Sequence, residues 1–404
     1  MPQFTATRAQ GLTLLTEFTP RMGRRYANER NTDHGAGRHR AVSMLSPYIR
    51  RRLMLESEVV AAALAAHGPE NAEKFVQEVV WRCYFKGWLE RRPQVWASYR
   101  DGLIADLAVL DTDRRLHRAV ENAESGQTGL EYFDTWAREL VETGYLHNHA
   151  RMWFASIWIF TLGLPWRIGA DFFLRHLLDG DPAANTLGWR WVAGLHTRGK
   201  PYAALASNIA TFTAHRFAPR DKDLAKVVSG LQDDEPEGLP PVLPLRAVTP
   251  PQSGLPTAVL ITEDDCRVED FDLSALDIRS VATLHASHLR SVREVSEPVS
   301  QFEAAALSDA AKRAGMTPAP MRAGVPGDLA SWAARAGACQ IVTAYVPQGP
   351  VYDWLQAAKP ALAAKGVSLC EWRRDWDSAI WPYATAGFFK VKQNIPQILD
   401  RVLS

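Results

Sequence analysis

The feature that most constrains this chain is a loss of periodicity between residues 219 and 255. The segment contains "DDEPEGLPPVLPLRAVTPPQSGL" (233–255), which is acidic, rich in proline and without helical or strand spacing. Such a segment buries no continuous apolar face and acts as a linker that is semi-rigid where prolines cluster. Because 404 residues exceed what one core usually holds, the chain is predicted to divide into residues 1–218 and 256–404, joined by the linker 219–255.

The two halves on either side of the linker have different patterns. Residues 70–90 carry apolar side chains at helical spacing, and residues 134–160 predict two helices broken at Gly144. After the linker come the short β-rich runs "TAVLIT" (257–262), "RSVATLHA" (279–286), "CQIVTAYV" (339–346) and "GVSLCEW" (366–372), separated by helical segments. This alternation predicts a mainly α-helical domain followed by a smaller Rossmann-like α/β domain with a parallel sheet. No glycine-rich phosphate fingerprint accompanies the sheet, so nucleotide binding is not predicted there.

Composition indicates a soluble globular protein, with 47% apolar and 23% charged residues and a net charge of +1. The charge is uneven, because residues 1–218 have 27 Lys/Arg against 22 Asp/Glu, whereas residues 219–404 have 19 against 23. A basic first half is compatible with a polyanionic partner. The longest apolar run, residues 152–166, is shorter than the roughly 20 residues that cross a bilayer, so no membrane partner is predicted. Four cysteines without paired spacing, and no signal peptide, favour a reducing cytoplasm.

The stretch "LLDGDPAANTLGWRW" (177–191) collects polar side chains inside an apolar region. Asp179 and Asp181 bracket a glycine, and Asn185 follows. A calcium loop is excluded, because its sixth position would need glycine but is Ala184, and its twelfth would need glutamate but is Arg190. Two histidines in "HNH" (147–149) point in nearly opposite directions on a helix, so a shared metal is not predicted either.

Two predicted helices carry polar and aromatic residues on one face at helical spacing. Taken singly, each polar residue is more often structural, and an exposed Glu–Arg pair contributes little stability. Taken together, the two faces predict a polar cavity between helices, which is where bundles hold cofactors. The faces consist of Glu78, Trp81, Arg82 and Phe85, and of Asn148, Arg151, Met152 and Ala155.

Two further features allow two interpretations each. The arginine run in "SPYIRRRL" (46–53) predicts a solvated helix face, unless it borders the mouth of the cavity and neutralises phosphates there. Trp166, Trp189 and Trp191 are either ordinary core residues or members of a chain of indoles that carries an electron to a redox cofactor.

Several motifs in residues 5–210 resemble the flavin-binding helical domain of DNA photolyases and cryptochromes, in the same order and with most of their internal spacing. They are "SMLSPYI" (43–49), "EVVWRCYF" (78–85), residues 126–152, "LPWRIGADFFLRHLLDGDPAANTLGWRW" (164–191) and "GKPYAA" (199–204). The last motif resembles the bacterial iron–sulphur branch of the family, but the cysteines that hold its cluster are missing, so no cluster is predicted.

The resemblance implies a U-folded FAD in the helical domain. Residues 1–218 are then the FAD-binding domain, and no metal is implied. The implied contacts are Tyr26, Ser43, Leu45 and Ser46 at the phosphates and ribityl chain, Arg82 and Asn148 against the cofactor, Arg151 paired with Asp179 beside the isoalloxazine, Asp181 at flavin N3–H and Asn185 at N5. A donor and a cation near the ring favour the reduced, anionic flavin.

The resemblance also implies a substrate pocket for a cyclobutane dimer and a tryptophan chain. Glu78, Trp81, Asn148, Met152 and Trp191 match the pocket residues. The inner two members of the electron-transfer chain match Trp189 and Trp166, whereas the outer position falls near Thr112 and Asp113 and has no tryptophan. Two DNA-contacting arginines of the family are replaced by His149 and Ala204.

The domain order departs from the family, in which an α/β domain precedes the helical one. Residues 373–396 are predicted to be a docking segment or, through Trp376 and Trp381, an extension of the electron route. The leading hypothesis is a blue-light-dependent flavoprotein that repairs pyrimidine dimers in DNA by electron transfer. The alternatives are a cryptochrome-like photoreceptor that signals to a protein partner through its α/β domain, and a flavoprotein without a light function.

Overall fold

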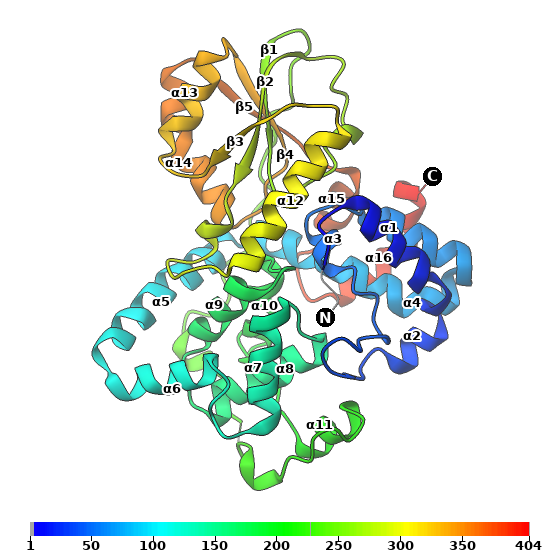
Figure 1. Cartoon of the computed structure of the whole chain (residues 1–404), viewed down its shortest axis with the longest axis vertical. Coiled ribbons are helices and arrows are strands. Elements are labelled where there is room, and N and C mark those ends of the chain that lie inside the picture. Colours follow the sequence, from blue (N-terminus) through cyan, green and yellow to red (C-terminus); the bar gives the residue numbers. More distant parts are fainter. Residues whose placement is uncertain (1–3, 227, 404) are drawn as a thin grey trace.

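The computed structural model describes residues 4–226 and 228–403. The first three residues of the predicted domain 1–218, residue 227 of the predicted linker and residue 404 lie outside the described residues. The first half of the chain is helical, and Figure 1 shows it below the sheet. Its helices are α1 Arg8–Phe18, α2 Arg24–Glu29, α3 Ser46–Arg50, α4 Glu56–Glu90, α5 Pro93–Thr112, α6 Arg114–Glu124, α7 Glu131–Thr143, α8 Asn148–Ser156, α9 Trp166–His176, α10 Pro182–Val192 and α11 Ala206–Phe212.

The second half contains a parallel sheet with the strand order β3-β2-β1-β4-β5. This confirms the predicted fold class. The apolar runs predicted the strands other than β3, whose sequence "APMR" is short, contains proline and is mostly exposed. The elements are β1 Pro256–Ile261, β2 Asp277–His285, α12 Glu297–Arg313, β3 Ala319–Arg322, α13 Gly327–Arg335, β4 Gln340–Ala344, α14 Pro350–Ala364 and β5 Ser368–Trp372.

Local sequence explains two breaks in the helical half. Gly144 ends α7 with a φ of +66°, a left-handed conformation that glycine adopts without strain, and α8 starts four residues later as predicted. Long helix α4 is kinked at Gly68, which is followed by Pro69. The break at Gly144 matters for function, because the chain then returns as α8 beside α7 and carries residues 148–152 toward α10.

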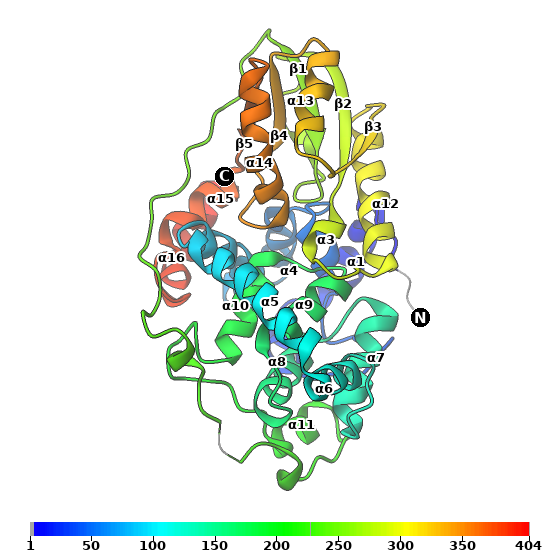
Figure 2. The ribbon, with the colours of Figure 1, turned by 90° about the vertical axis from the view of Figure 1, so that its left-hand side faces the viewer.

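Residues 213–255 form no α-helix or strand in the part that the structure describes. Figure 2 shows this segment running along the outside of the molecule from the bottom of the helical half to the top of the sheet. It is held in place along its path: Arg190 donates to both carboxylate oxygens of Glu235, at 2.5 and 2.7 Å, and the Leu243 amide donates to the Arg91 carbonyl at 2.8 Å. The segment is therefore a strap that is attached to the helical half.

The chain after β5, here called the C-terminal arm (residues 373–403), leaves the sheet and packs on α4. It contains α15 Asp375–Ile380, a 3-10 turn at Trp381–Tyr383 and α16 Phe389–Leu403. Trp381 is fully buried over Gly87, where a Cβ would lie 2.4 Å from the indole Cδ1, so only glycine leaves enough room. Residues 373–396, predicted as a docking segment, thus pack on the helical half, and their role stays a prediction. Figure 1 shows α16 next to α4.

The arginine run at residues 50–52 is buried, so its prediction as a solvated helix face is wrong. Each of the three side chains is at most 3% exposed and meets one carboxylate of residues 263–265, which directly follow β1. Because these acidic partners come from a segment more than two hundred positions away, local sequence gave no sign of them. We call this cluster the arginine–acid joint. Its pairs are Arg50–Asp264 at 3.0 Å, Arg51–Glu263 at 3.0 Å and Arg52–Asp265 at 3.3 Å.

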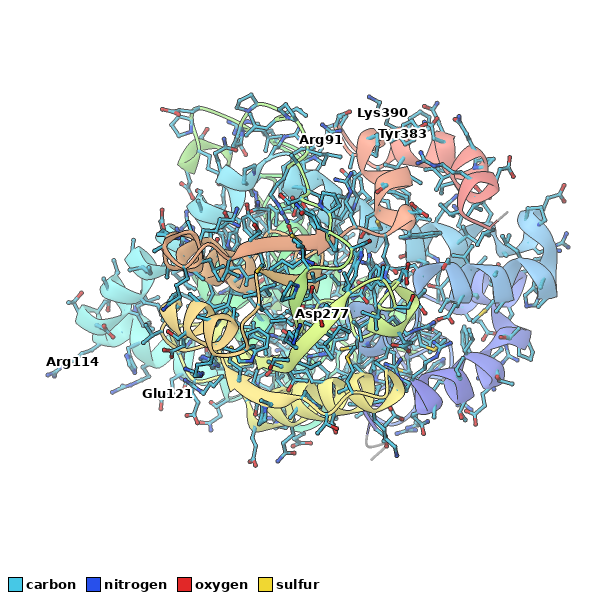
Figure 3. The ribbon with its side chains drawn as sticks, turned by 90° about the horizontal axis from the view of Figure 1, so that it is seen from above. Arg91, Arg114, Glu121, Asp277, Tyr383 and Lys390 are labelled. Carbon is cyan, nitrogen blue, oxygen red and sulfur yellow. The ribbon has the colours of Figure 1, made fainter. Side chains whose placement is uncertain are left out.

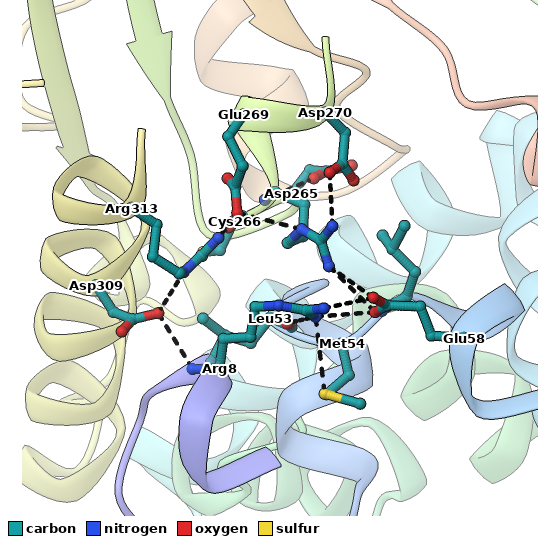
Figure 4. Close-up of polar contacts among 12 residues, drawn as sticks. Arg8, Leu53, Met54, Glu58, Asp265, Cys266, Glu269, Asp270, Asp309 and Arg313 are labelled. Carbon is teal, nitrogen blue, oxygen red and sulfur yellow. Dashed lines mark hydrogen bonds and ion pairs between the residues drawn. The ribbon is translucent and has the colours of Figure 1, made fainter. Parts of the chain in front are cut away.

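A second ionic cluster, drawn in Figure 4, lies farther along the same interface. Glu58 of α4 accepts from Arg8 at 2.5 Å and from Arg267, which follows β1, at 3.0 Å. The Arg8 backbone amide also donates to Asp309 of α12 at 3.1 Å. Charged contacts therefore join the two halves at more than one place.

Candidate functional site

The structure gathers charged side chains around Asp179, in the loop between α9 and α10. Arg151 of α8 donates to both Asp179 carboxylate oxygens, at 3.0 and 3.1 Å. The guanidinium of Arg82, from α4, lies 3.9 Å from the same carboxylate, and the Ser46 hydroxyl at the start of α3 donates to it. One buried carboxylate thus holds together α3, α4, α8 and the loop. We call this cluster the Asp179 hub.

The hub carries more positive than negative charge. Burial acts to raise the pKa of Asp179, but Arg151 and then Arg82 outweigh it and hold the pKa below its usual value. The carboxylate is therefore ionised at neutral pH and faces two cations. Arg82 is only partly enclosed, with 25% of its side chain exposed, and within the described chain its guanidinium donates no hydrogen bond. N–H donors of Arg82 are thus available to another acceptor.

The residues predicted at the phosphates and ribityl chain lie on α2 and around the start of α3. Tyr26 is buried against Phe75, with ring centroids 5.1 Å apart, while Ser43 and Ser46 are half-buried and Leu45 is fully buried. Burial, together with the nearby Glu78 carboxylate, raises the pKa of the Tyr26 phenol, so the hydroxyl stays a neutral donor. Nothing contradicts these residues as cofactor contacts, and that role stays a prediction.

Asp181 lies two residues beyond the hub and faces a different set of groups. Its carboxylate caps α10 by accepting from the Ala184 amide at 2.8 Å, and it lies 3.6 Å from Lys86 and 3.7 Å from Arg50. Burial would raise its pKa, yet Lys86 and Arg50 keep the pKa below its usual value. Sequence reasoning missed Lys86, although its position four residues after Arg82 on α4 puts both cations on the same helix face.

Asn185, on the first turns of α10, is oriented by the preceding helix. Its Nδ2 donates to the Ala170 carbonyl of α9 at 2.8 Å. Its Oδ1 accepts no hydrogen bond from the described residues, so one polar atom of this largely buried amide remains available to a ligand. The role predicted for Asn185 beside flavin N5 needs such an available atom.

The five residues of the predicted substrate pocket all reach solvent. Trp81 is 38% exposed, Asn148 is exposed, and Glu78, Met152 and Trp191 are half-buried. They come from α4, α8 and α10, and α10 packs on both other helices. The structure adds a residue that sequence reasoning missed: Arg30, directly after α2, lies 2.8 Å from Glu78.

Trp189 and Trp166, the predicted inner members of an electron-transfer chain, are buried. The ring of Trp189 is 6.3 Å from that of Trp158 and perpendicular to it, and Trp166 is 5.8 Å from Tyr99. The indole N–H of Trp189 is buried without a hydrogen-bond partner among the described residues. Other aromatic rings therefore lie next to both tryptophans in the helical core. A tryptophan-rich core and an electron route would each show this arrangement.

No helix among residues 4–226 and 228–403 is both long enough and apolar enough to cross a membrane. Within the same residues, no three or more His, Cys, Asp or Glu side chains gather in a way that could hold a metal ion.

Known proteins match the part of the chain that contains most of the hub. Residues 75–228 match the family described as the FAD-binding domain of DNA photolyase. Among curated proteins, the chain is 37% identical over 166 residues to the deoxyribodipyrimidine photo-lyase of Streptomyces griseus, covering 41% of this chain and 35% of that protein. It is 36% identical over 184 residues to the enzyme of the same name from Thermus thermophilus, covering 44% and 40%. The chain thus spans well under half the length of these relatives.

Among solved structures, a bacterial class III photolyase from Agrobacterium tumefaciens matches 52% of this chain and 43% of its own at 25% identity, with a TM-score of 0.43. The family match 75–228 contains the hub residues other than Ser46, and it contains all five residues of the predicted pocket.

Proposed function

We propose that this chain, whose FAD-binding domain makes it a member of the photolyase and cryptochrome family, splits pyrimidine dimers in DNA under blue light. The cofactor follows from the matched domain, whereas the substrate and the reaction are our proposal. The observation that carries it is that five residues stay accessible on α4, α8 and α10, next to the Asp179 hub: Glu78, Trp81, Asn148, Met152 and Trp191.

The residues at the hub fit FAD. The cofactor combines an anionic diphosphate with a ring that accepts and donates hydrogen bonds, so its site needs cations and polar atoms with spare capacity. The guanidinium of Arg82 is accessible and donates no hydrogen bond to another described residue. The Oδ1 of Asn185 accepts no hydrogen bond from these residues. The buried Asp179 orients Arg151 and Arg82 before any ligand arrives, which lowers the entropy that binding loses.

Reduced FAD, when bound in this domain, supplies the light-driven electron that opens the dimer and receives it back. The protein's own residues position the substrate. Trp81 and Trp191 give apolar walls for the two bases, and Met152 adapts its shape between them. A base that is already damaged pairs poorly, so extruding it from the duplex costs less than extruding a paired base.

Glu78 and Asn148 are the polar residues of the pocket. Burial raises the pKa of Glu78, while Arg30 and Lys74 act to lower it. A carboxyl with a raised pKa is protonated more readily when a substrate covers it, and then it donates a hydrogen bond to a base carbonyl. Arg30 fixes the Glu78 side chain at 2.8 Å from its guanidinium. Asn148, exposed at the first position of α8, offers both a donor and an acceptor to the second base.

One observation favours a photoreceptor as the second candidate. Asp181 lies 3.7 Å from Arg50, and Arg50 lies 3.0 Å from Asp264, directly after β1. A change of charge near Asp181 would therefore reach the α/β domain through two buried ion pairs. A receptor would use this connection to signal, whereas a repair enzyme has no need for it.

A repair assay separates the two candidates. Purified protein with reduced FAD is illuminated in the absence of oxygen with an oligonucleotide that carries one cyclobutane thymine dimer, and restored thymines are measured by chromatography. The proposal predicts repair that depends on light and falls about tenfold or more in Glu78→Ala, which removes the hydrogen-bond donor for the base carbonyl. Bound FAD that responds to light without any repair would favour the receptor.

A further inference from the structure

The C-terminal arm brings an aromatic residue onto the predicted pocket. Phe388 lies against Trp81 with ring centroids 3.9 Å apart, and it meets Tyr84 edge-on at 5.5 Å. The Tyr84 hydroxyl donates to the Ala386 carbonyl at 2.8 Å and fixes the loop that carries Phe388. The C-terminal arm therefore packs on α4 and also contacts Trp81 of the predicted pocket.

The same contact leaves two large aromatic side chains in solvent. Trp81 is 38% exposed, and Phe389, the residue after the buried Phe388, is 68% exposed. Phe85, one turn after Trp81, is half-buried and lies 5.9 Å from it. Large aromatic side chains that stay exposed near one another usually mark an interaction site, because a protein without a partner there would bury this apolar surface in its own core.

Lysines flank these rings. Lys390 is exposed, and within the described residues its Nζ bonds only the Thr385 hydroxyl, at 2.9 Å. The Nζ of Lys392 lies 3.5 Å from the carboxylate of Glu73 on α4. Figure 3 shows Lys390 and Tyr383 at the outer edge of the arm near Arg91, whose side chain donates to the Trp381 carbonyl at 3.1 Å.

Lysine together with accessible aromatic rings favours a nucleic acid over a protein partner. Protein interfaces are depleted in lysine, whereas single-stranded nucleic acid is bound by rings on which bases stack and by cations that follow the phosphates. The position agrees with this partner, because Trp81 lies one helical turn from Glu78 in the predicted pocket.

We propose that residues 386–392 of the C-terminal arm, together with Trp81, form a DNA-binding surface that holds the nucleotides flanking the lesion. Phe389 stacks on an unpaired base, Lys390 neutralises an adjacent phosphate, and Phe388 supports Trp81 from behind. This rests on the proposed function and extends it to a segment outside the matched residues 75–228. The arm contributes to binding and positioning of the DNA and has no part in the chemistry.

The test compares DNA binding by full-length variants in the dark. Fluorescence anisotropy with a labelled oligonucleotide that carries one thymine dimer gives the affinity. Phe389→Ala should weaken binding at least about fivefold, the effect of losing one stacked base. Lys390→Gln should weaken it less and reduce the slope of log affinity against log salt by about one. Both side chains are exposed, so neither change is expected to disturb folding.

Matched controls come from the α/β domain. Val325→Ala removes an equally exposed apolar side chain, and Lys359→Gln removes an exposed lysine on α14; both should bind DNA like the unchanged protein. Phe389→Ala and Lys390→Gln variants that bind as tightly as these controls would overturn the proposal. So would tighter binding by Phe388→Ala, because that result would mean that the arm shields Trp81.

The two proposals fail in different ways. If the unchanged protein repairs the dimer in light but the arm variants bind DNA normally, only the DNA-binding surface is wrong. If the unchanged protein binds the oligonucleotide through Phe389 but repairs nothing, the surface stands and dimer repair is wrong.

Discussion

The Asp179 hub and the arginine–acid joint are built from the same chemical groups and differ in how deeply the cations are buried. In the joint, Arg50 and Arg51 are at most 2% exposed and carboxylates face them from the sheet side. In the hub, Arg82 and Arg151 keep 25% and 21% of their side chains exposed. Residue type therefore does not distinguish a ligand site from a structural contact; here the exposed fraction of the cations does.

The backbone supports the same distinction. Arg52 of the joint has a φ of +51°, in the left-handed region that favours glycine, and it is held there by Glu56, Asp265 and Asp377. Three carboxylates around one buried arginine hold an unfavourable conformation in place. Such a cluster fixes one arrangement of two domains, whereas the hub has room to exchange partners.

The largest expected effect comes from breaking the joint. Arg52→Ala leaves the buried carboxylates of Glu56 and Asp377 without an ion-pair partner among the described residues, whereas Asp265 keeps Arg374. Losing one member of a buried ion pair costs about 3–5 kcal/mol, so we expect the free energy of unfolding to fall by that amount. Urea unfolding followed by tryptophan fluorescence measures it.

The matched control for that variant is an exposed pair on the sheet. Arg279 lies 2.6 Å from Asp277 with 53% of its side chain exposed, so Arg279→Ala should change the free energy of unfolding by less than about 0.5 kcal/mol. Equal effects of the two substitutions would mean that the joint is no stronger than a surface contact.

Removing a cation from the hub should lower the affinity for FAD more than it lowers the stability of the fold. Arg82→Ala removes a cation without a hydrogen bond to another described residue, so the protein should unfold at nearly the same urea concentration. Charge-assisted hydrogen bonds contribute about 1.5–3 kcal/mol, so the affinity for FAD should fall roughly ten- to hundredfold. Flavin fluorescence titration measures the affinity. A large loss of stability with unchanged FAD binding would reverse the roles of the two clusters.

Acid should destabilise the helical half through His147. Burial lowers the pKa of His147 to about 3. The unfolded chain binds a proton at His147 below pH about 6.5, but the folded protein does not until pH about 3. Stability is therefore complete above that range and falls as the pH drops through it, by about 2 kcal/mol at pH about 5.

The measurement is the difference between the unchanged protein and His147→Asn. Asparagine can still accept from the His149 amide, as His147 does now at 3.2 Å, so the start of α8 is kept. Between about pH 7 and pH 5, the unchanged protein should lose about 2 kcal/mol more of its free energy of unfolding than the variant. Parallel curves for the two proteins would contradict a neutral, buried His147.

Sequence alone predicted what depends on local pattern. Apolar runs predicted β1, β2, β4 and β5, and Gly144 predicted the end of α7, whereas the exposed, proline-containing β3 gave no signal. Resemblance led to the Arg151–Asp179 pair, which the structure contains. The functional roles of the hub residues and the domain bounds 1–218, 219–255 and 256–404 stay predictions.

The rest depends on partners that are distant in the sequence. The arginine run was wrongly expected in solvent, because its acidic partners follow β1. Phe388 reaches Trp81 from the far end of the chain, and Arg30 reaches Glu78 from the residue after α2. No spacing rule connects such segments, so these contacts could be found only from the folded structure.

A crystal structure of the protein with FAD tests the distinction between hub and joint most directly. We expect the cofactor among α3, α4, α8 and α10, with new hydrogen bonds from Arg82 and to Asn185 Oδ1, and with the pairs of residues 50–52 and 263–265 unchanged. FAD bound elsewhere, with Arg82 still without a hydrogen bond, would contradict the account.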